Sequence, residues 1–222
     1  MHLHTCTAQK GKRMREFYLI RHGQTTGNAE HRLQGHTDTH LNDTGRDQAR
    51  FAGGVLKDRG ITPDLVIVSP LDRVQETAEL ATGRERISFE VDPRIIEMGF
   101  GVLEMIRQDE MDPEISDAFH DHPDRYCPPE GGESFQDVIG RIRSFLDDMR
   151  KRPEAGTVLV VSHGAAIHAM IHCLNQDPLA DFWKIHIGNC AVLKVTLAEK
   201  EGEGDSWTFL DPGFFPRHPR NK

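Results

Sequence analysis

The chain has 222 residues, of which 37% are hydrophobic and 28% are charged, and its formal net charge is −8 at pH 7. This length favours one domain, with at most an insertion, and the apolar fraction is sufficient for a buried core. The acidic balance argues against nucleic acid as a partner, because phosphate backbones are bound by basic surfaces. No segment reaches the roughly 18 consecutive apolar residues of a membrane span, so no membrane partner is expected.

The N-terminal segment, MHLHTCTAQKGKRMR, contains basic side chains but no apolar stretch of the kind that marks a secretory signal. Met14 precedes the first apolar run and is a candidate start of the natural protein. We therefore interpret residues 1–14 as a disordered extension. The four cysteines are far apart in the sequence and include no Cys-x-x-Cys pair, which favours a reduced, cytoplasmic setting.

Apolar runs alternate with helical patterns along the chain. Continuous or β-rich apolar runs predict strands at 16–20, 64–69, 87–91 and 157–162. Apolar residues at helical spacing, with Asn42 as the first N-cap, predict helices at 43–59, 70–80, 135–151 and 165–174. A short helix is expected near 112–121, and two late edge strands at 190–197 and 206–210.

This alternation predicts an α/β fold, a three-layer α/β/α sandwich with a mostly parallel central sheet. We assign residues 15–211 to a single domain with a small insertion at about 98–134, and residues 212–222 to a loose tail whose Phe pair can pack. In sheets of this kind, ligands bind outside the carboxyl ends of the strands.

Three of the predicted strands end in polar residues of similar type. The strand at 16–20 runs into Arg21 and His22, and the strand at 157–162 runs into His163 and Gly164. Arg73 lies in the first turn of the helix that follows the strand at 64–69. If these strands are parallel, the two arginines and two histidines converge at one rim of the sheet. An antiparallel arrangement would separate them.

Such a rim is suited to a phosphoryl group, because its negative charge is spread over three oxygens that a ring of fixed donors can bind. Arg21, Arg73 and a protonated His163 are candidates to hold these oxygens. Asn28 can add an amide donor, and helix N-termini near the rim favour an anion further.

The same residues can also carry out a reaction. A neutral His22 can attack phosphorus through a ring nitrogen and form a phosphoenzyme. The leaving alkoxide then needs a proton, and Glu97 is the best-placed acid in the sequence, with Glu104 and Glu133 as alternatives.

Several motifs in this order resemble the histidine phosphatase superfamily, the phosphoglycerate-mutase-like proteins of branch 1. The matching segments are LIRHGQTTGN (19–28), RLQGHTDTHLNDTGRDQA (32–49), SPLDRVQETAEL (69–80), EMGFGVLE (97–104) and VSHG (161–164). The resemblance covers roughly residues 16–197 and implies a metal-independent phosphomonoester hydrolase without a cofactor. It implies that His22 is the phosphorylated nucleophile and that Glu97 is the proton donor and later the base.

The resemblance also implies a phosphate pocket and a substrate-binding rim. It assigns Arg21, Arg73, Asn28 and His163 to the pocket, and it places Gln34, Gly35, Gly164 and the GGES segment (131–134) near the substrate. Relatives usually carry an arginine at the position of His168 and often a tryptophan at the position of His36. The expected substrate is a small phosphorylated metabolite, selected by the irregular segment 98–134.

Other functions remain open at this level. A phosphoglycerate-type phosphomutase fits the same motifs, but the compact segment between Glu97 and His163 favours a phosphatase. A noncatalytic module that only binds a phosphorylated ligand would not need a proton donor, so the presence of Glu97 argues against this alternative. A metallohydrolase would use HDHPD (120–124) with His168 and His172, which are spaced to share a helical face. We judge that a polar loop and helix packing explain these histidines better.

Overall fold

The structure is a computed structural model that describes residues 15–152 and 156–215. The extension predicted at 1–14 lies outside the described residues, as does the end of the predicted tail, 216–222. Within the described ranges, no helix is long and apolar enough to cross a membrane.

The central sheet has six strands in the order β3-β2-β4-β1-β5-β6. Strands β3, β2, β4 and β1 run parallel, whereas β5 and β6 are antiparallel to their neighbours. The strands are β1 (Arg15–Arg21), β2 (Leu65–Val68), β3 (Glu90–Val91), β4 (Val158–Ser162), β5 (Val192–Leu197) and β6 (Ser206–Asp211). The mostly parallel α/β fold predicted from the sequence is confirmed.

Two of the longer α-helices begin directly after a residue whose side chain caps the helix. The Asn42 side chain accepts a hydrogen bond from the amide of Gly45, and Ser134 forms a capping box with Asp137. The helices are α1 (Thr26–Ala29), α2 (Asp43–Asp58), α3 (Asp72–Thr82), α4 (Pro113–His120), α5 (Phe135–Lys151) and α6 (Gly164–Asn175). Short 3₁₀ turns occur at Arg86–Ser88, Pro93–Ile95, Gly101–Leu103, Gln108–Glu110, Pro123–Arg125 and Leu179–Asp181.

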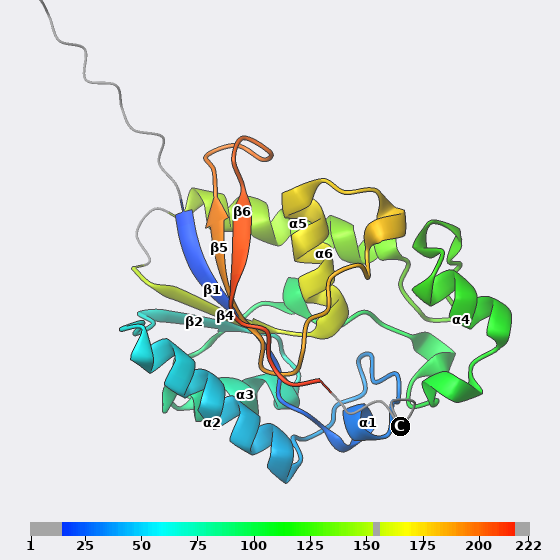
Figure 1. The fold of residues 1–222 in the computed structure, drawn as a ribbon, viewed down its shortest axis with the longest axis horizontal. Coiled ribbons are helices and arrows are strands. Elements are labelled where there is room, and N and C mark those ends of the chain that lie inside the picture. Colours follow the sequence, from blue (N-terminus) through cyan, green and yellow to red (C-terminus); the bar gives the residue numbers. More distant parts are fainter. Residues whose placement is uncertain (1–14, 153–155, 216–222) are drawn as a thin grey trace, which may run out of the picture.

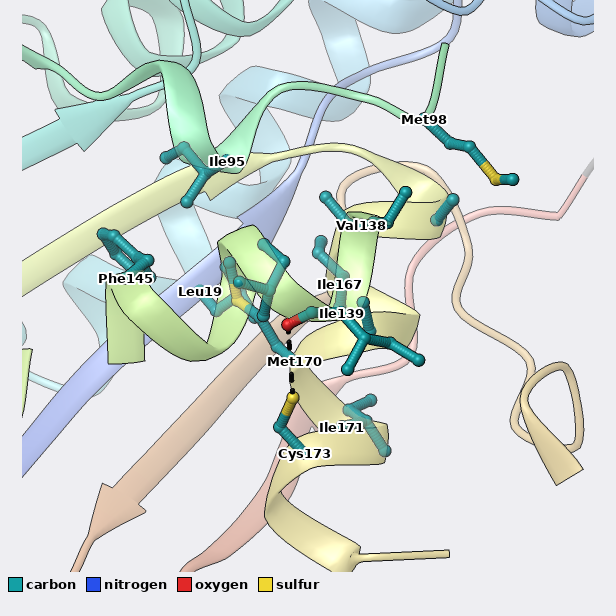
Figure 2. Packing of buried hydrophobic residues seen from close by; sticks show 14 of the residues in the cluster. Leu19, Ile95, Met98, Val138, Ile139, Phe145, Ile167, Met170, Ile171 and Cys173 are labelled. Atoms are coloured by element: carbon teal, nitrogen blue, oxygen red, sulfur yellow. Dashed lines mark hydrogen bonds between the residues drawn. The ribbon is translucent and has the colours of Figure 1, made fainter. Parts of the chain in front are cut away.

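The helices form two layers, with α2 and α3 on one face of the sheet and α5 and α6 on the other (Figure 1). Successive side chains of a strand point to opposite faces, so β1 places Leu19 in one core cluster and Ile20 in the other. Figure 2 shows Leu19 beneath α5 and α6, close to Ile139 and Met170. Because these strands are buried on both faces of the sheet, their sequences are continuous apolar runs.

Two strand predictions need correction. At 87–91 only Glu90–Val91 is a strand, because residues 86–88 form a 3₁₀ turn that leaves the Ile87 side chain 92% exposed. The segment at 190–197 was expected at an edge, but β5 lies between β1 and β6. Helix α3 also begins at Asp72 rather than Pro70.

The loop after β1 is held by very close backbone contacts with helix α2. A Cβ atom on Gly23 would lie 2.4 Å from the carbonyl oxygen of Gly45, and one on Gly45 would lie 2.0 Å from that of Gln24. The amide of Gly23 also donates to the Thr77 hydroxyl of α3 at 3.0 Å. The position of the His22 loop therefore depends on glycine at these two positions.

We expect Gly45→Ala to lower the free energy of unfolding by about 1–3 kcal/mol, because the new methyl group has no space without a backbone shift. Gly54→Ala is the matched control on the same helix, since a Cβ there meets nothing within 4 Å. It should raise stability by about 0.5–1 kcal/mol. Urea denaturation of both variants measures the difference, and equal effects would contradict the close-contact interpretation.

Candidate active site

The carboxyl ends of three parallel strands meet at one rim of the sheet. Arg21 at the end of β1 pairs with Ser162 at the end of β4, and the amide of His22 donates to the Ser162 carbonyl at 2.9 Å. Ser69, which follows β2, donates its amide to Val161 of β4. The parallel arrangement assumed from the sequence is confirmed, and it brings the residues that follow these strands together.

Two guanidinium groups are buried at this rim. Arg73, in the first turn of α3, has no exposed surface and donates to the carbonyl oxygens of Thr37 at 2.9 Å and Gly35 at 2.8 Å. Arg21 donates to the carbonyl of Ile187 at 2.6 Å. The Nε atoms of both arginines are buried and have no hydrogen-bond partner within the described residues. Burial lowers the pKa of both groups, whereas the nearby Glu97 charge opposes that shift.

His22 is held in one tautomer. Its Nδ1 lies 2.7 Å from the carbonyl oxygen of Gly23, and since a carbonyl only accepts, Nδ1 carries the proton. The lone pair therefore resides on Nε2. Burial lowers the pKa of His22 well below its ordinary value, and the charges of Arg73 and Arg21 lower it further. The ring is therefore neutral near pH 7.

His163 lies beside His22, with 5.3 Å between the ring centroids. Its Nε2 is 2.7 Å from the Ser69 hydroxyl, and its Nδ1 is buried without a partner among the described residues. The sequence analysis expected a protonated His163, but burial and the charge of Arg73 lower its pKa well below the ordinary value. An anion between these groups would oppose that shift, because it stabilises the imidazolium.

Glu97 is anchored at the start of α6. Its Oε1 accepts hydrogen bonds from the amides of Met98 at 2.9 Å, Ala165 at 3.0 Å and Ala166 at 3.3 Å. From the sequence, helix N-termini near the rim were expected to favour a substrate anion. In the structure, the amides of the first turn of α6 instead bind the Glu97 carboxyl group. Since Oε1 only accepts, a proton on Glu97 would reside on Oε2.

The two alternative acids have different surroundings. Glu104 accepts from the amides of His36 and Thr37, both at 2.8 Å, and from the Thr37 hydroxyl, and thereby closes the loop after α1. Glu133 pairs with Arg141 at 2.9 Å and accepts from the amide of Gly99 at 2.8 Å. Neither lines the cavity beside His22, whereas Glu97 does.

Asn28, Gln34, Gly35 and Gly164, the candidates for phosphate or substrate binding, all line the cavity, but their contacts differ. The Asn28 oxygen accepts from the amide of Thr25 at 3.1 Å, which leaves the Asn28 NH₂ group as a donor. Gln34 accepts from the Thr25 hydroxyl at 2.7 Å. Gly35, at φ +53°, presents its carbonyl to Arg73. Gln34 and Gly35 therefore position other groups of the site.

The cavity has a volume of about 250 Å³, and its outer part is lined by side chains to which the sequence analysis assigned no individual role. The part of the cavity lined by Arg21, His22, Arg73 and Glu97 is called its inner end, and His163 contacts the His22 ring but is not among the lining side chains. The outer wall includes Arg32, Phe100, Gln108, Phe119, His120 and Trp183. Several of these belong to the segment 98–134, which the sequence analysis singled out for specificity. Trp183 follows α6, where nothing in the sequence marked it.

The geometry does not favour a metal site at the histidine pair of α6. Both ring nitrogens of His168 lie 2.8 Å from backbone carbonyls, those of Gly164 and Ile185, so neither is free to bind a metal. In the described chain, the metal-ligand groups that come within 4.8 Å of one another are His40, Asp72 and Glu76. The carboxylates of this cluster already pair with Arg86 and Arg46.

The fold and the site together define a class of protein in which a strand-end histidine lies among arginines at the rim of a mostly parallel sheet. The profile of the histidine phosphatase superfamily, branch 1, matches residues 17–209, and the chain belongs to this superfamily.

Individual relatives cover nearly the whole chain. The probable phosphoglycerate mutase GpmB of Erwinia tasmaniensis is 32% identical over 203 residues, which span 90% of this chain and 93% of that protein. A mycobacterial glucosyl-3-phosphoglycerate phosphatase, solved with VO₃, is 29% identical with a TM-score of 0.72, covering 88% and 96% of the two chains. A putative α-ribazole-5′-P phosphatase from Escherichia coli is 26% identical with a TM-score of 0.76, covering 89% and 96%.

The ionised Glu133 carboxylate, beside the cavity-lining segment, makes the free energy of unfolding depend on pH in the acid range. Burial alone would raise the pKa of Glu133, but the nearby His36 ring, 3.7 Å away, and hydrogen bonds from Arg141 lower it to about 2. A carboxyl group with a lowered folded-state pKa stabilises the fold above its unfolded value, near 4.5, and this contribution is lost as the pH falls towards 2.

We therefore expect Glu133→Gln to lower the free energy of unfolding by up to about 3 kcal/mol at pH 7. The gap between the variant and the wild type should narrow as the pH falls from 5 towards 2. Glu130→Gln, at an exposed position of the same loop, is the matched control and should show no such gap. Denaturant titrations across this pH range would contradict the assignment if the gap stayed constant.

Proposed function

We propose that this protein is a metal-independent phosphomonoester hydrolase that acts through a phosphohistidine at His22. The observation that carries the proposal is the environment of the His22 ring. Nδ1 donates to Gly23, so Nε2 keeps its lone pair, and the ring remains neutral beside two arginines. A neutral imidazole among fixed positive charges is suited to attack the phosphorus of a bound phosphate ester.

In the first step, Arg21 and Arg73 bind the phosphoryl oxygens, with the Asn28 amide as a further donor. Backbone carbonyls hold one side of each guanidinium group, which leaves the buried Nε atoms to donate. The bound anion favours protonation of His163, whose ring lies 5.3 Å from that of His22, and the positive charge that results adds to the charges of the two arginines. These groups stabilise the charge that spreads over the equatorial oxygens during transfer.

Nε2 of His22 then forms a bond to phosphorus while the ester P–O bond breaks. The departing oxygen takes the proton of Glu97, which resides on Oε2 because backbone amides bind Oε1. In the second step the Glu97 carboxylate removes a proton from water. The water oxygen attacks phosphorus, the P–N bond breaks, inorganic phosphate leaves, and neutral His22 and protonated Glu97 are restored.

A phosphoglycerate-type mutase is the second candidate, because a relative at 32% identity is a probable phosphoglycerate mutase. The two functions differ in the acceptor of the phosphoryl group, which is water for a hydrolase and a second substrate hydroxyl for a mutase. Release of inorganic phosphate from 3-phosphoglycerate, without formation of the 2-isomer, would reject the mutase.

His22→Ala should abolish hydrolysis of p-nitrophenyl phosphate, because the variant lacks the Nε2 lone pair that attacks phosphorus in the proposed reaction. The wild type should retain its activity in a chelator. His186→Ala, at an exposed position, is the matched control and should behave like the wild type. Rapid acid quench of the wild type should trap a phosphohistidine, and residual turnover in His22→Ala would reject the nucleophile assignment.

Glu97→Gln should lower kcat for alkyl phosphates by about 100- to 10,000-fold, the usual contribution of general acid–base catalysis. p-Nitrophenolate leaves without a proton, so the variant should release about one equivalent of it in a burst before slow hydrolysis of the phosphoenzyme. Glu130→Gln serves as the matched control and should show no burst. Stopped-flow absorbance separates the two phases, and an unchanged steady state on both substrates would exclude Glu97.

A further inference from the structure

The outer wall of the cavity has a chemical character that bears on the substrate. Trp183, between α6 and β5, lies against Phe119 of α4, with ring centroids 5.1 Å apart, and against His168, at 4.7 Å. Phe100 packs on the other side of Phe119, at 5.6 Å. Side chains from three separate segments therefore join into one aromatic wall beside the phosphoryl end of the cavity.

The ring nitrogens of Trp183 and His168 in this wall already contact backbone carbonyls, and Gln108 adds an uncharged amide to the wall. The Trp183 indole N–H donates to the carbonyl of Phe119 at 2.7 Å, so the indole offers the cavity only carbon surface. Both ring nitrogens of His168 contact backbone carbonyls. Burial lowers the pKa of His120, which is therefore uncharged near pH 7. The wall thus provides apolar and π surface rather than charge.

A short anionic leaving group would need a positive charge in the same place. Outside the phosphoryl end, Arg32 is the cationic side chain that lines the described cavity. Its Nε pairs with Glu30 at 2.6 Å, and its Nη1 donates to the carbonyl of Met105 at 2.8 Å. The charge of Arg32 is thus already paired with the Glu30 carboxylate, and a substrate carboxylate would have to compete with Glu30 for it.

We propose that the preferred substrate is the phosphate ester of a compact alcohol with an apolar planar ring, which stacks on Trp183, rather than a short carboxylic acid such as phosphoglycerate. This inference rests on the proposed hydrolase function. The cavity of about 250 Å³ lies below the range of about 300–1,000 Å³ typical of drug-sized ligands, which suits a phosphoryl group and a single ring.

The test compares benzyl phosphate, glycerol 3-phosphate and 3-phosphoglycerate. All three are esters of primary alcohols, so differences in kcat/KM do not mainly reflect differences in leaving-group reactivity. We expect the wild-type kcat/KM for benzyl phosphate, measured by phosphate release, to exceed that for 3-phosphoglycerate at least tenfold. Trp183→Leu should reduce the benzyl-to-glycerol ratio of kcat/KM about tenfold. Trp183→Phe, which keeps an aromatic ring, should restore most of that ratio and guards against a folding defect.

Trp207→Leu is the matched control, because Trp207 on β6 also donates its indole N–H, to Asn175 at 2.9 Å, but does not line the cavity. It should leave the ratio unchanged. A wild-type preference for 3-phosphoglycerate, or an equal loss on all three esters in Trp183→Leu, would overturn the proposed substrate class while leaving the hydrolase intact. Failure of the wild type to hydrolyse any of the esters would instead overturn the proposed function, and this inference with it.

Discussion

The pocket is organised around the burial of two positive charges. Arg21 and Arg73 lie at the end of the sheet without a hydrogen-bonded carboxylate among the described residues, and burying a charge costs several kcal/mol unless other groups offset it. Carbonyl oxygens of Gly35, Thr37 and Ile187 offset part of this cost, and the Glu97 charge acts on both guanidinium groups. In the proposed function, the phosphate ester would supply the remaining negative charge, so that burial of the two arginines would favour substrate binding.

The glutamates near this pocket illustrate how packing assigns different roles to one side chain. Glu104 is bound by amides and a hydroxyl group and closes a loop, whereas Glu133 is paired with Arg141. Glu97 has one oxygen fixed by amides of its own loop and of α6, and it lines the cavity. The proposed acid is thus distinguished by a free second oxygen rather than by its residue type.

The inner and outer parts of the cavity are built in different ways. The inner end consists of Arg21 and His22 at the end of β1, Arg73 in the first turn of α3, and Glu97, which the first turn of α6 binds. The outer wall comes from α4 and from the loops around Phe100 and Trp183, which pack on one another through their rings. In the proposed reaction, phosphoryl transfer therefore depends on residues positioned by the sheet, and selection of the leaving group depends on contacts between loops. This division is consistent with relatives named for different phosphorylated compounds.

The sequence by itself determined the layered α/β fold and the residues at the strand ends, because apolar periodicity and strand polarity are local patterns. Arg21, His22, Arg73 and His163 could be placed together on that basis, and Asn42 marked the start of α2. The tertiary structure decided the short β3, the interior place of β5, the neutral state of His163 and the engagement of α6 by Glu97. It also decided that Trp183 lines the cavity. These features depend on burial and on contacts between segments far apart in the chain, for which the sequence contains no local signal.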